Sequence, residues 1–346
     1  MKKKFAALTA VSLTAAMVLA ACGGSSSSSS TTAAASGAAG SSAAAETTAA
    51  AASSGDKVDL TLATGSTSAN YYAIGGVLST VLNPVLTKSK ITVTSTGASK
   101  ANVQLLEDGD ANLAILQNDV AYYASTGTDL FEGEEKYEDW GALCTMYDEV
   151  VQVFTLDSSI KTFTDLKGKT VSVGAAGSGD NFAAEQIFSE YGMTFDDVNA
   201  VYQSYSDSAE GMKDGKIDAA FCVSGAPTTA LVDLAATANK PINIITLEDD
   251  HIENLMKNYP FYAKTTIPAG TYDGQAEDAT TVSIRAMLVA SNSVSSDVVE
   301  ELMNAIFDNL DKLKEGHAKF ANLSKETAQD GVSIPLHEGA EKFFAQ

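Results

Sequence analysis

From residue 57 onward, short apolar runs alternate with helical patterns, an order typical of layered α/β proteins rather than of β-sandwiches or helical bundles. The apolar runs predict strands at residues 60–63, 91–94, 113–116, 170–173 and 218–223. The helical patterns predict helices at residues 71–86, 98–107 and 181–191, and further helices that begin at Asp119 and Pro227. We therefore predict an α/β fold.

Two halves of this region resemble each other at an offset of about 110 residues. Residues 66–71 follow the first strand of one half, and residues 177–182 follow the first strand of the other. Further on, residues 109–114 match residues 215–220. Because the two matches occur in the same order, a pair of related lobes is favoured over chance similarity between turns.

Two long apolar stretches, at residues 150–156 and 282–290, fall where the chain would cross between the lobes. We expect hinge strands there. Lobe 1 would then consist of residues 57–150 together with 284–346, and lobe 2 of residues 151–283.

The N-terminus predicts export. Lysines at positions 2–4 precede an apolar run that ends at Ala21, which predicts a signal peptide at residues 1–21. The tetrapeptide that ends at Cys22 resembles a bacterial lipobox, in which the cysteine is acylated and becomes the new N-terminus; the alternative is ordinary secretory cleavage beside a chance cysteine. Residues 22–56 then form the acylated cysteine and a Ser/Ala/Thr/Gly-rich tether that is too poor in large apolar residues to fold.

No later stretch of 18 apolar residues occurs, so lipid on Cys22 would be the only membrane anchor. We expect a monomer, outside the cytoplasm, attached by this lipid to the bacterial cell membrane. Without residues 1–21, which hold three lysines and no acidic residue, 19 basic and 44 acidic residues remain, a net charge of −25. Such a surface repels phosphate backbones, so we exclude nucleic acid as a partner.

Catalytic patterns are missing from the sequence. His251, His317 and His337 have no partners at ligand spacing, so we expect surface positions for all three. The glycine-rich segment 174–179 fits neither a dinucleotide-binding loop nor a P-loop, and it lacks the P-loop lysine. We therefore predict a protein that is not an enzyme, with no cofactor and no metal.

Two cysteines and the one arginine lie within apolar stretches of the chain. Cys144 and Cys222 lie inside apolar runs, so we expect buried free thiols. The one arginine, Arg285, lies in the second hinge stretch. It could clamp a ligand carboxylate or act as a structural ion-pair partner, and the structural interpretation is favoured.

Polar turns follow the predicted strands and provide hydroxyls and backbone N–H groups at helix N-termini, where anions bind well. Each turn could instead be a simple N-cap. Because the turns lie at the carboxyl ends of strands, where ligands of open α/β sheets bind, we predict a polar anion cradle. The candidate ligand-binding residues are Ser66, Asn70, Tyr71, Tyr72, Ser99, Gln117, Tyr147, Ser178, Gly179, Asp180, Ser224, Gly225 and Pro227.

The order and spacing of the turn motifs carry the most specific signal. The motifs are Thr64-Gly65-Ser66, Asn70-Tyr71-Tyr72, Gly97-Ala98-Ser99, Leu116-Gln117-Asn118-Asp119, Gly177-Ser178-Gly179, residues 215–221, Ser224-Gly225-Ala226-Pro227-Thr228, residues 266–272 and residues 335–340. Over essentially all of residues 57–346, this series resembles the TAXI class of extracytoplasmic solute receptors, which serve tripartite ATP-independent periplasmic (TRAP) transporters.

The resemblance implies a two-lobed type II periplasmic-binding-protein-like fold with hinge strands. It implies that the lobes close on a small organic acid or amino acid, similar to glutamate, glutamine or 2-oxoglutarate. It also implies delivery to a membrane permease driven by an ion gradient, typically of sodium. The alternatives are a binding protein of an ATP-driven (ABC) importer, a sensor or adhesin lipoprotein, and an exported enzyme on the same scaffold.

The sequence departs from the pattern of this class at two positions. Lys100 stands where an apolar residue is usual, and it would add a positive charge near the cleft. Asp180 stands where threonine is common, so an acceptor replaces a donor. Asp180 would either cap the following helix, which is the favoured interpretation, or face an ammonium group of the ligand.

Overall fold

The structure is a computed structural model, and it describes residues 57–346. The predicted signal peptide, Cys22 and the predicted tether lie outside the described residues. Within residues 57–346, no helix is both long enough and apolar enough to span a bilayer.

The described strands form one ten-stranded sheet in the order β2-β1-β3-β10-β4-β7-β5-β6, with β8 on β4 and β9 on β10. The strands are β1 (Val58–Ala63), β2 (Ser89–Thr94), β3 (Leu113–Gln117), β4 (Trp140–Thr155), β5 (Thr170–Ser172), β6 (Asn199–Val201), β7 (Ala219–Ser224), β8 (Asn243–Ile244), β9 (Ala263–Ile267) and β10 (Ala279–Ser291). The α-helices are α1 (Asn70–Leu82), α2 (Ser99–Glu107), α3 (Asn118–Thr126), α4 (Gly179–Glu190), α5 (Tyr205–Lys213), α6 (Thr229–Thr237), α7 (Asp249–Asn258), α8 (Ser296–Asp308), α9 (Leu310–Gly316) and α10 (Glu338–Phe344).

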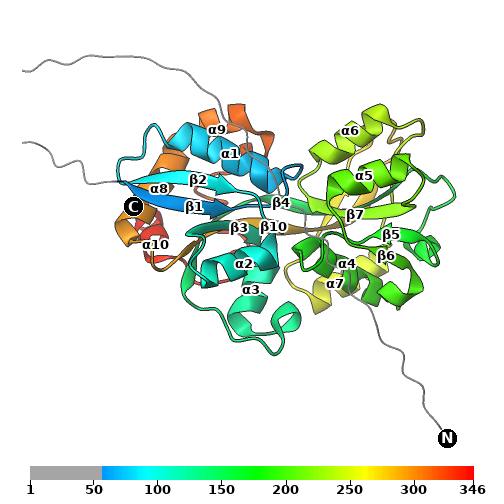
Figure 1. The fold of residues 1–346 in the computed structure, drawn as a ribbon, viewed down its shortest axis with the longest axis horizontal. Coiled ribbons are helices and arrows are strands. Elements are labelled where there is room, and N and C mark those ends of the chain that lie inside the picture. The colour runs from blue at the N-terminus through cyan, green and yellow to red at the C-terminus, as the bar shows by residue number, and fades with distance from the viewer. Residues whose placement is uncertain (1–56) are drawn as a thin grey trace, which may run out of the picture. The chain divides into compact units, whose positions relative to one another are not determined.

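The two ends of the sheet repeat one arrangement. At one end β2, β1 and β3 are parallel, and β10 joins β3 antiparallel. At the other end β6, β5 and β7 are parallel, and β4 joins β7 antiparallel. Figure 1 shows these ends as two lobes connected through β4 and β10. This is the predicted two-lobed type II periplasmic-binding-protein-like fold with hinge strands, which the structure confirms.

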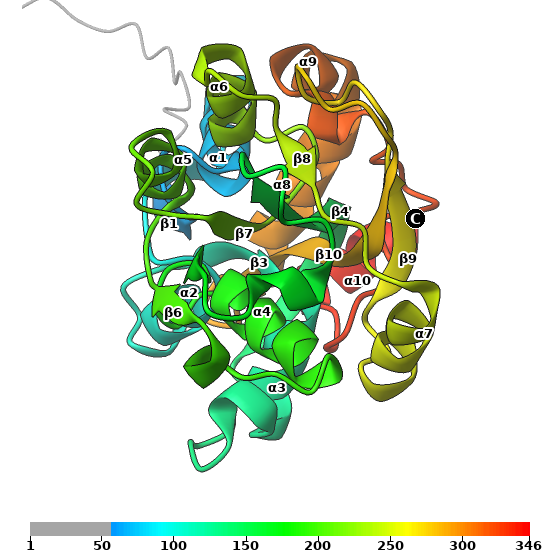
Figure 2. The ribbon, with the colours of Figure 1, turned by 90° about the vertical axis from the view of Figure 1, so that its right-hand side faces the viewer.

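Helices cover both faces of the sheet in each lobe. In lobe 1, side chains of α1, α8 and α10 bury one face, and side chains of α2 and α3 bury the other. In lobe 2, α4 and α7 pack on one face while α5 and α6 pack on the other. Figure 2 shows α5 and α6 on the opposite side of β7 from α4. Burial on both faces explains why the strands appear in the sequence as short continuous apolar runs.

The hinge strands are longer than predicted, because β4 begins at Trp140 and not at Val150. All residues of β4 are buried except Asp148. The polar residues Asp148 and Glu149 interrupt the apolar pattern and hid the first part of the strand in the sequence. β10 pairs antiparallel with β4 from Ser283↔Val150 to Ser291↔Trp140.

Other predictions can now be compared with the structure. Cys144 and Cys222 are buried and free, as predicted. The surface position predicted for His337 is wrong, because its side chain is buried. Its Nδ1 accepts the Gly339 N–H at 3.1 Å and so caps α10, and its Nε2 lies 3.1 Å from the Val294 carbonyl oxygen. Burial lowers the pKa of His337, which keeps the ring neutral and able to accept.

Candidate functional site

A cavity of about 70 Å³ lies between the two lobes, at the carboxyl ends of the strands. This volume holds a few water molecules or a small ligand. The first turns of α1 and α2 line it from lobe 1, and the first turns of α4 and α5 line it from lobe 2. Eight of the residues predicted to bind ligand line it: Ser66, Tyr71, Ser99, Gln117, Ser178, Gly179, Asp180 and Ser224.

The other five predicted residues lie outside the cavity lining. Asn70 and Gly225 join the lobes, because Asn70 Nδ2 donates to the Gly225 carbonyl oxygen at 2.9 Å. Tyr147 stands behind the lining. Tyr72 is half-buried on α1, and Pro227 is exposed after a cis Ala226–Pro227 bond.

Glu149 also lines the cavity, although it is not among the residues predicted from the sequence. It comes from hinge strand β4 and is only 2% exposed. Tyr71 donates to its Oε2 at 2.6 Å, and Tyr147 donates to its Oε1 at 3.0 Å. Burial, with a smaller contribution from the nearby charge of Asp180, raises the pKa of Glu149 to about 8. The available signal in the sequence was the acidic pair Asp148-Glu149 directly before the apolar stretch of residues 150–156.

Asp180 lies in the first turn of α4 and is half-buried in the cavity wall. It accepts a hydrogen bond from the Tyr205 hydroxyl. Burial raises the pKa of Asp180 to about 7. The cap of α4 is Ser178, whose Oγ accepts the Asn181 N–H at 3.1 Å. The capping function expected of Asp180 therefore belongs to Ser178, and the Asp180 carboxyl group faces the cavity.

Gln117 reaches across the gap between the lobes. Its side chain is 2% exposed, and no residue within 57–346 donates a hydrogen bond to its Oε1. A Cβ atom on Gly179 would lie 1.8 Å from this oxygen. The absence of a side chain at Gly179 therefore allows the first turn of α4 to approach the end of β3 closely.

The helix N-termini around the cavity differ in their capping. Within residues 57–346, the N-cap residues of α1, α2 and α3 in lobe 1 make no side-chain cap bond, although Asp119 Oδ1 accepts the Val120 N–H in the first turn of α3 at 2.8 Å. In lobe 2, Ser178 caps α4, and Ser204 caps α5 by accepting the Asp207 N–H at 3.3 Å. Free N–H groups and the positive ends of the helix dipoles therefore concentrate on the lobe 1 side.

The positively charged residues expected near the cleft are engaged elsewhere, and none of the described residues that line the cavity is lysine or arginine. Lys100 Nζ lies 2.7 Å from Glu134 Oε1, so the charge predicted near the cleft is neutralised at the surface. Lys319, from the 3₁₀-helix Ala318–Phe320 of lobe 1, donates to the Ala226 carbonyl oxygen in lobe 2. Lys319 thus connects the lobes beside the cavity.

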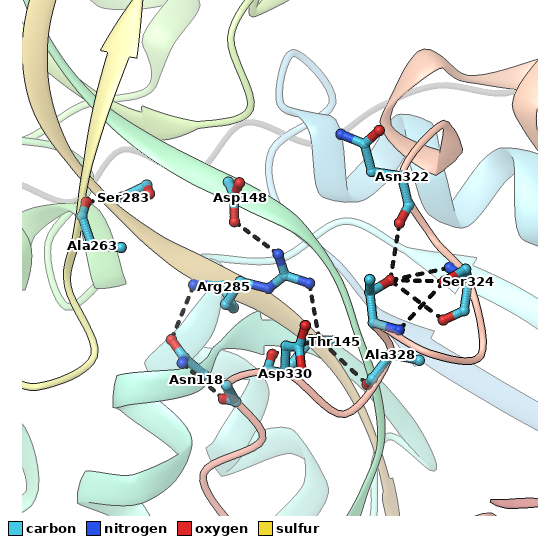
Figure 3. Close-up of polar contacts among 12 residues, drawn as sticks. Asn118, Thr145, Asp148, Ala263, Ser283, Arg285, Asn322, Ser324, Ala328 and Asp330 are labelled. Carbon is cyan, nitrogen blue, oxygen red and sulfur yellow. Dashed lines mark hydrogen bonds and ion pairs between the residues drawn. The ribbon is translucent and has the colours of Figure 1, made fainter.

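Arg285 is a structural residue of the hinge (Figure 3). Its Nη1 donates to Asp148 Oδ1 at 2.9 Å, and its Nη2 donates to Thr145 Oγ1 at 3.1 Å. Its backbone N–H donates to Asn118 Oδ1 at 3.1 Å. These contacts tie β10 to β4 and to α3. Arg285 does not line the cavity.

Aromatic side chains join the lobes at a second place. The rings of Tyr122 and Phe261 have centroids 5.1 Å apart, and those of Tyr123 and Phe182 are 5.4 Å apart. Tyr122 and Tyr123 belong to α3 of lobe 1, whereas Phe182 belongs to α4 of lobe 2. The structure therefore shows the two lobes in contact on more than one side of the hinge.

Within residues 57–346, no three His, Cys, Asp or Glu side chains are grouped as metal ligands.

The model of the NMT1-like family matches residues 62–346. Among solved structures, a protein of Bordetella bronchiseptica RB50 is 14% identical, with 84% of this chain and 82% of that chain covered and a TM-score of 0.50. A putative L-cystine ABC transporter from Listeria monocytogenes is 15% identical, with 79% and 98% covered and a TM-score of 0.49. A Prochlorococcus marinus protein in complex with methylphosphonate is 14% identical, with 76% and 90% covered and a TM-score of 0.48. At these identities the likeness concerns the fold alone.

Proposed function

The chain belongs to the NMT1-like family, and from this premise we propose that it is an extracytoplasmic solute-binding receptor that delivers its ligand to a membrane transporter. The observation that carries the proposal is the small cavity lined by the polar turns of both lobes. A ligand that touches both lobes binds the closed state better than the open state and so shifts the protein toward closure. The closed receptor would then dock on the permease.

The proposed ligand is a small organic acid or amino acid. The uncapped helix N-termini of lobe 1 support an anionic group, because their backbone N–H groups and dipoles attract negative charge. The cavity volume of about 70 Å³ supports a compact ligand. The receptor would bind its solute without converting it, as the missing nucleophile and base in the sequence suggest.

The proposed partner is the permease of a TRAP transporter of the TAXI class, and the series of turn motifs supports this choice. The proposed hinge lies near residues 150/151 and 283/284. Tyr147 and Ala286 pack in a hydrophobic cluster of lobe 1, whereas Val151 and Ile284 pack in a cluster of lobe 2, which supports crossings within three residues of these positions, the second of them between residues 284 and 286. Rotation about the intervening residues would open the cavity.

A thermal-shift panel of amino acids, 2-oxo acids and di- and tricarboxylates tests the receptor proposal. A ligand at 100 times its Kd should stabilise the folded chain by about 2.7 kcal/mol. If no member of the panel raises the melting temperature, the receptor proposal fails.

The class of transporter needs a separate test in membrane vesicles that contain the permease. We expect uptake of the ligand to follow an imposed sodium gradient. Uptake that requires ATP and ignores the gradient would assign the chain to an ABC importer. Binding without any uptake would favour a sensor or adhesin.

The proposed lipid anchor rests on Cys22. Metabolic labelling with a fatty acid should mark the wild-type chain and leave Cys22→Ala unlabelled. Equal labelling of the two chains would contradict acylation at this residue.

A further inference from the structure

We propose that Glu149, Asp180 and Gln117 Oε1 form a subsite for a cationic group of the ligand, so that the preferred solute carries an ammonium group beside its acid. This inference rests on the receptor function proposed above and narrows its ligand class. It makes the cavity selective for amino acids over the corresponding 2-oxo acids. The three groups come from the hinge strand, lobe 2 and lobe 1, so the subsite is complete only when the lobes are closed.

The first support is the unpartnered acceptor of Gln117. Its Oε1 is buried and receives no hydrogen bond from the described residues, although its side chain lines the cavity. A buried acceptor without a donor is unfavourable. An ammonium or other N–H group of a ligand would supply that donor. A carboxylate or oxo group would not, because both are acceptors.

The second support is the hydrogen bonding of the two carboxyl groups. Tyr71 and Tyr147 each donate to one oxygen of Glu149, and Tyr205 donates to Asp180. A carboxyl group that accepts at both oxygens is held in the arrangement of a carboxylate, because a protonated oxygen would need an acceptor of its own. Two tyrosine hydroxyls thus hold Glu149 in the arrangement of a carboxylate, whereas Asp180 has a tyrosine at one oxygen only and shares it with the Val223 carbonyl oxygen, 3.0 Å from the Tyr205 hydroxyl.

The third support is the local charge balance. Two carboxyl groups share a cavity whose described lining contains no lysine or arginine. Buried carboxylates without a positive partner are unstable, and their pKa values rise in response, to about 8 for Glu149 and about 7 for Asp180. Among the described cations, Lys319 feels the charge of Glu149, but it lies outside the cavity lining and donates to the Ala226 carbonyl oxygen. A ligand ammonium would provide the missing positive charge at the point between the two acids.

This arrangement predicts the pH dependence of binding. The titratable groups around the two acids are Tyr71, Tyr147, Tyr205, Cys222 and Lys319. Of these neighbours, none has an ordinary pKa between 6 and 8, so the acids dominate in this range. An ammonium favours the ionised acids, and its binding near pH 6.5 should release protons. An oxo acid would favour the protonated acids, and its binding should take protons up.

Calorimetry on the intact chain tests the subsite with three pairs of probes that differ only at the α-carbon: glutamate and 2-oxoglutarate, alanine and pyruvate, and leucine and 4-methyl-2-oxopentanoate. At least one amino acid should bind about tenfold or more tightly than its oxo partner. Repeating the titration in buffers of different ionisation enthalpy measures the proton count, and we expect release on binding of the amino acid.

Substitution then locates the subsite. Glu149→Gln should weaken the binding of the amino acid about ten- to hundredfold. The affinity for the oxo acid should stay the same or increase. Asp180→Asn should also weaken the binding of the amino acid, but by less than Glu149→Gln, because Asp180 is less buried than Glu149. Glu210→Gln on the exposed side of α5 is the matched control, since Glu210 pairs with Lys213 outside the cavity. Circular dichroism and melting without ligand show whether each variant folds.

The outcomes separate the two proposals. If an oxo acid binds more tightly than its amino partner, or if Glu149→Gln weakens both members of a pair equally, the cation subsite is wrong while the receptor function stands. If Glu149→Gln does not fold, Asp180→Asn and the proton count decide in its place. If the wild-type chain binds no member of the wider acid panel, the receptor proposal fails and the subsite fails with it.

Discussion

The two lobes have the same strand order and turn the same strand ends toward the cavity, yet they present opposite chemistry there. In lobe 1 the helices α1 and α2, whose first turns line the cavity, begin without a side-chain cap from the described residues, and their N–H groups remain available. In lobe 2 serine caps occupy the N–H groups of α4 and α5, and Asp180 adds a carboxyl group. One fold repeated twice can therefore offer donors from one side and acceptors from the other.

This difference also explains how closure can select a ligand. The acceptors that face the cavity come from both lobes, with Asp180 from lobe 2 and Gln117 and Glu149 from lobe 1, so a zwitterion is fully matched only in the closed state. The free energy gained on closure then depends on both ends of the ligand. Substitutions at equivalent places in the two lobes should thus have different effects.

The largest effect is expected where the lobes meet most closely. Gly179→Ala places a methyl group 1.8 Å from Gln117 Oε1 in the closed state. Overpacking of this kind destabilises by about 1–3 kcal/mol, so affinity measured by calorimetry should fall about ten- to hundredfold. The open state does not require this contact, so the melting temperature without ligand should change little.

Two further variants check that closure is the cause. Gly76→Ala on α1 is the matched control, because a methyl group there meets no described atom within 4 Å. Adding Gln117→Ser to Gly179→Ala shortens the opposing side chain and should restore part of the lost closure, which small-angle scattering with and without ligand can follow. A double variant as open as the single one would show that the clash lies elsewhere.

Alanine substitutions of one serine in each lobe should separate effects on ligand affinity from effects on the free energy of unfolding. Ser178→Ala removes the cap of α4 and should lower the free energy of unfolding by about 1 kcal/mol. Its hydroxyl also lines the cavity, so we expect about a tenfold loss of affinity as well. Ser66 in lobe 1 caps no helix, since the described hydrogen-bond partner of its Oγ is the Ser68 Oγ at 3.2 Å, and Ser66→Ala tests this difference. It should therefore lower affinity while the denaturation midpoint stays the same, and a stability loss equal to that of Ser178→Ala would contradict the difference between the lobes.

The buried acids predict how stability without ligand depends on pH. The pKa of Glu149 is about 8 and that of Asp180 about 7, both above the ordinary value of about 4. The folded state therefore holds protons that the unfolded state has released, and the stability they contribute is present at low pH and lost as pH rises through 7 to 8. Chemical denaturation should show a smaller free energy of unfolding at pH 9 than at pH 6.

Asp119 allows a comparison with an acid outside the cavity. Its side chain is buried in lobe 1, and burial raises its pKa to about 7. Asp119→Asn and Glu149→Gln should both reduce the pH dependence of stability, but only Glu149→Gln should change ligand affinity. A saturating amino acid should also flatten the pH dependence in the wild type, because the ammonium stabilises the ionised acids. If the ligand leaves the slope unchanged, the acids do not face it.

The sequence predicted the repeated α/β arrangement well, because strand and helix periodicities are local properties. β1, α1, β2, α2 and β3 lie within a few residues of their predicted positions. The polar turns were also found in the sequence, since the residue after a strand end faces the same edge in every α/β unit.

The missed parts of the site depend on contacts between distant segments. Glu149 was hidden because Asp148 and Glu149 break the apolar pattern of β4, and only the pairing with β10 shows that the strand continues. Tyr205 reaches Asp180 from another helix, and Lys319 reaches Ala226 from the C-terminal segment. The prediction of an anion cradle likewise treated all turns alike. Whether a serine caps its own helix or leaves the N–H groups free depends on side-chain geometry that the sequence does not specify.

The smallest effect on ligand binding is expected for Arg285→Lys. Arg285 stands opposite Asp148 in the register of β10 and β4, and Asp148 is the exposed residue between Tyr147 and Glu149. Because neighbouring side chains of a strand point to opposite faces, the ion pair lies on the face of the hinge away from the cavity. A lysine can keep one of the two contacts of the guanidinium group, with Asp148 or with Thr145.

Since the Arg285–Asp148 pair is partly exposed, its loss should cost about 0.2–1 kcal/mol in the free energy of unfolding, with ligand affinity unchanged. Glu149→Gln replaces the next residue of the same strand and should show the reverse: a large loss of amino-acid affinity without the loss of the ion pair. Calorimetry and denaturation on the two variants give this comparison directly. If Arg285→Lys instead weakens the ligand tenfold while Glu149→Gln does not, the ligand carboxylate lies on the guanidinium group, and the division of donors and acceptors between the lobes is wrong.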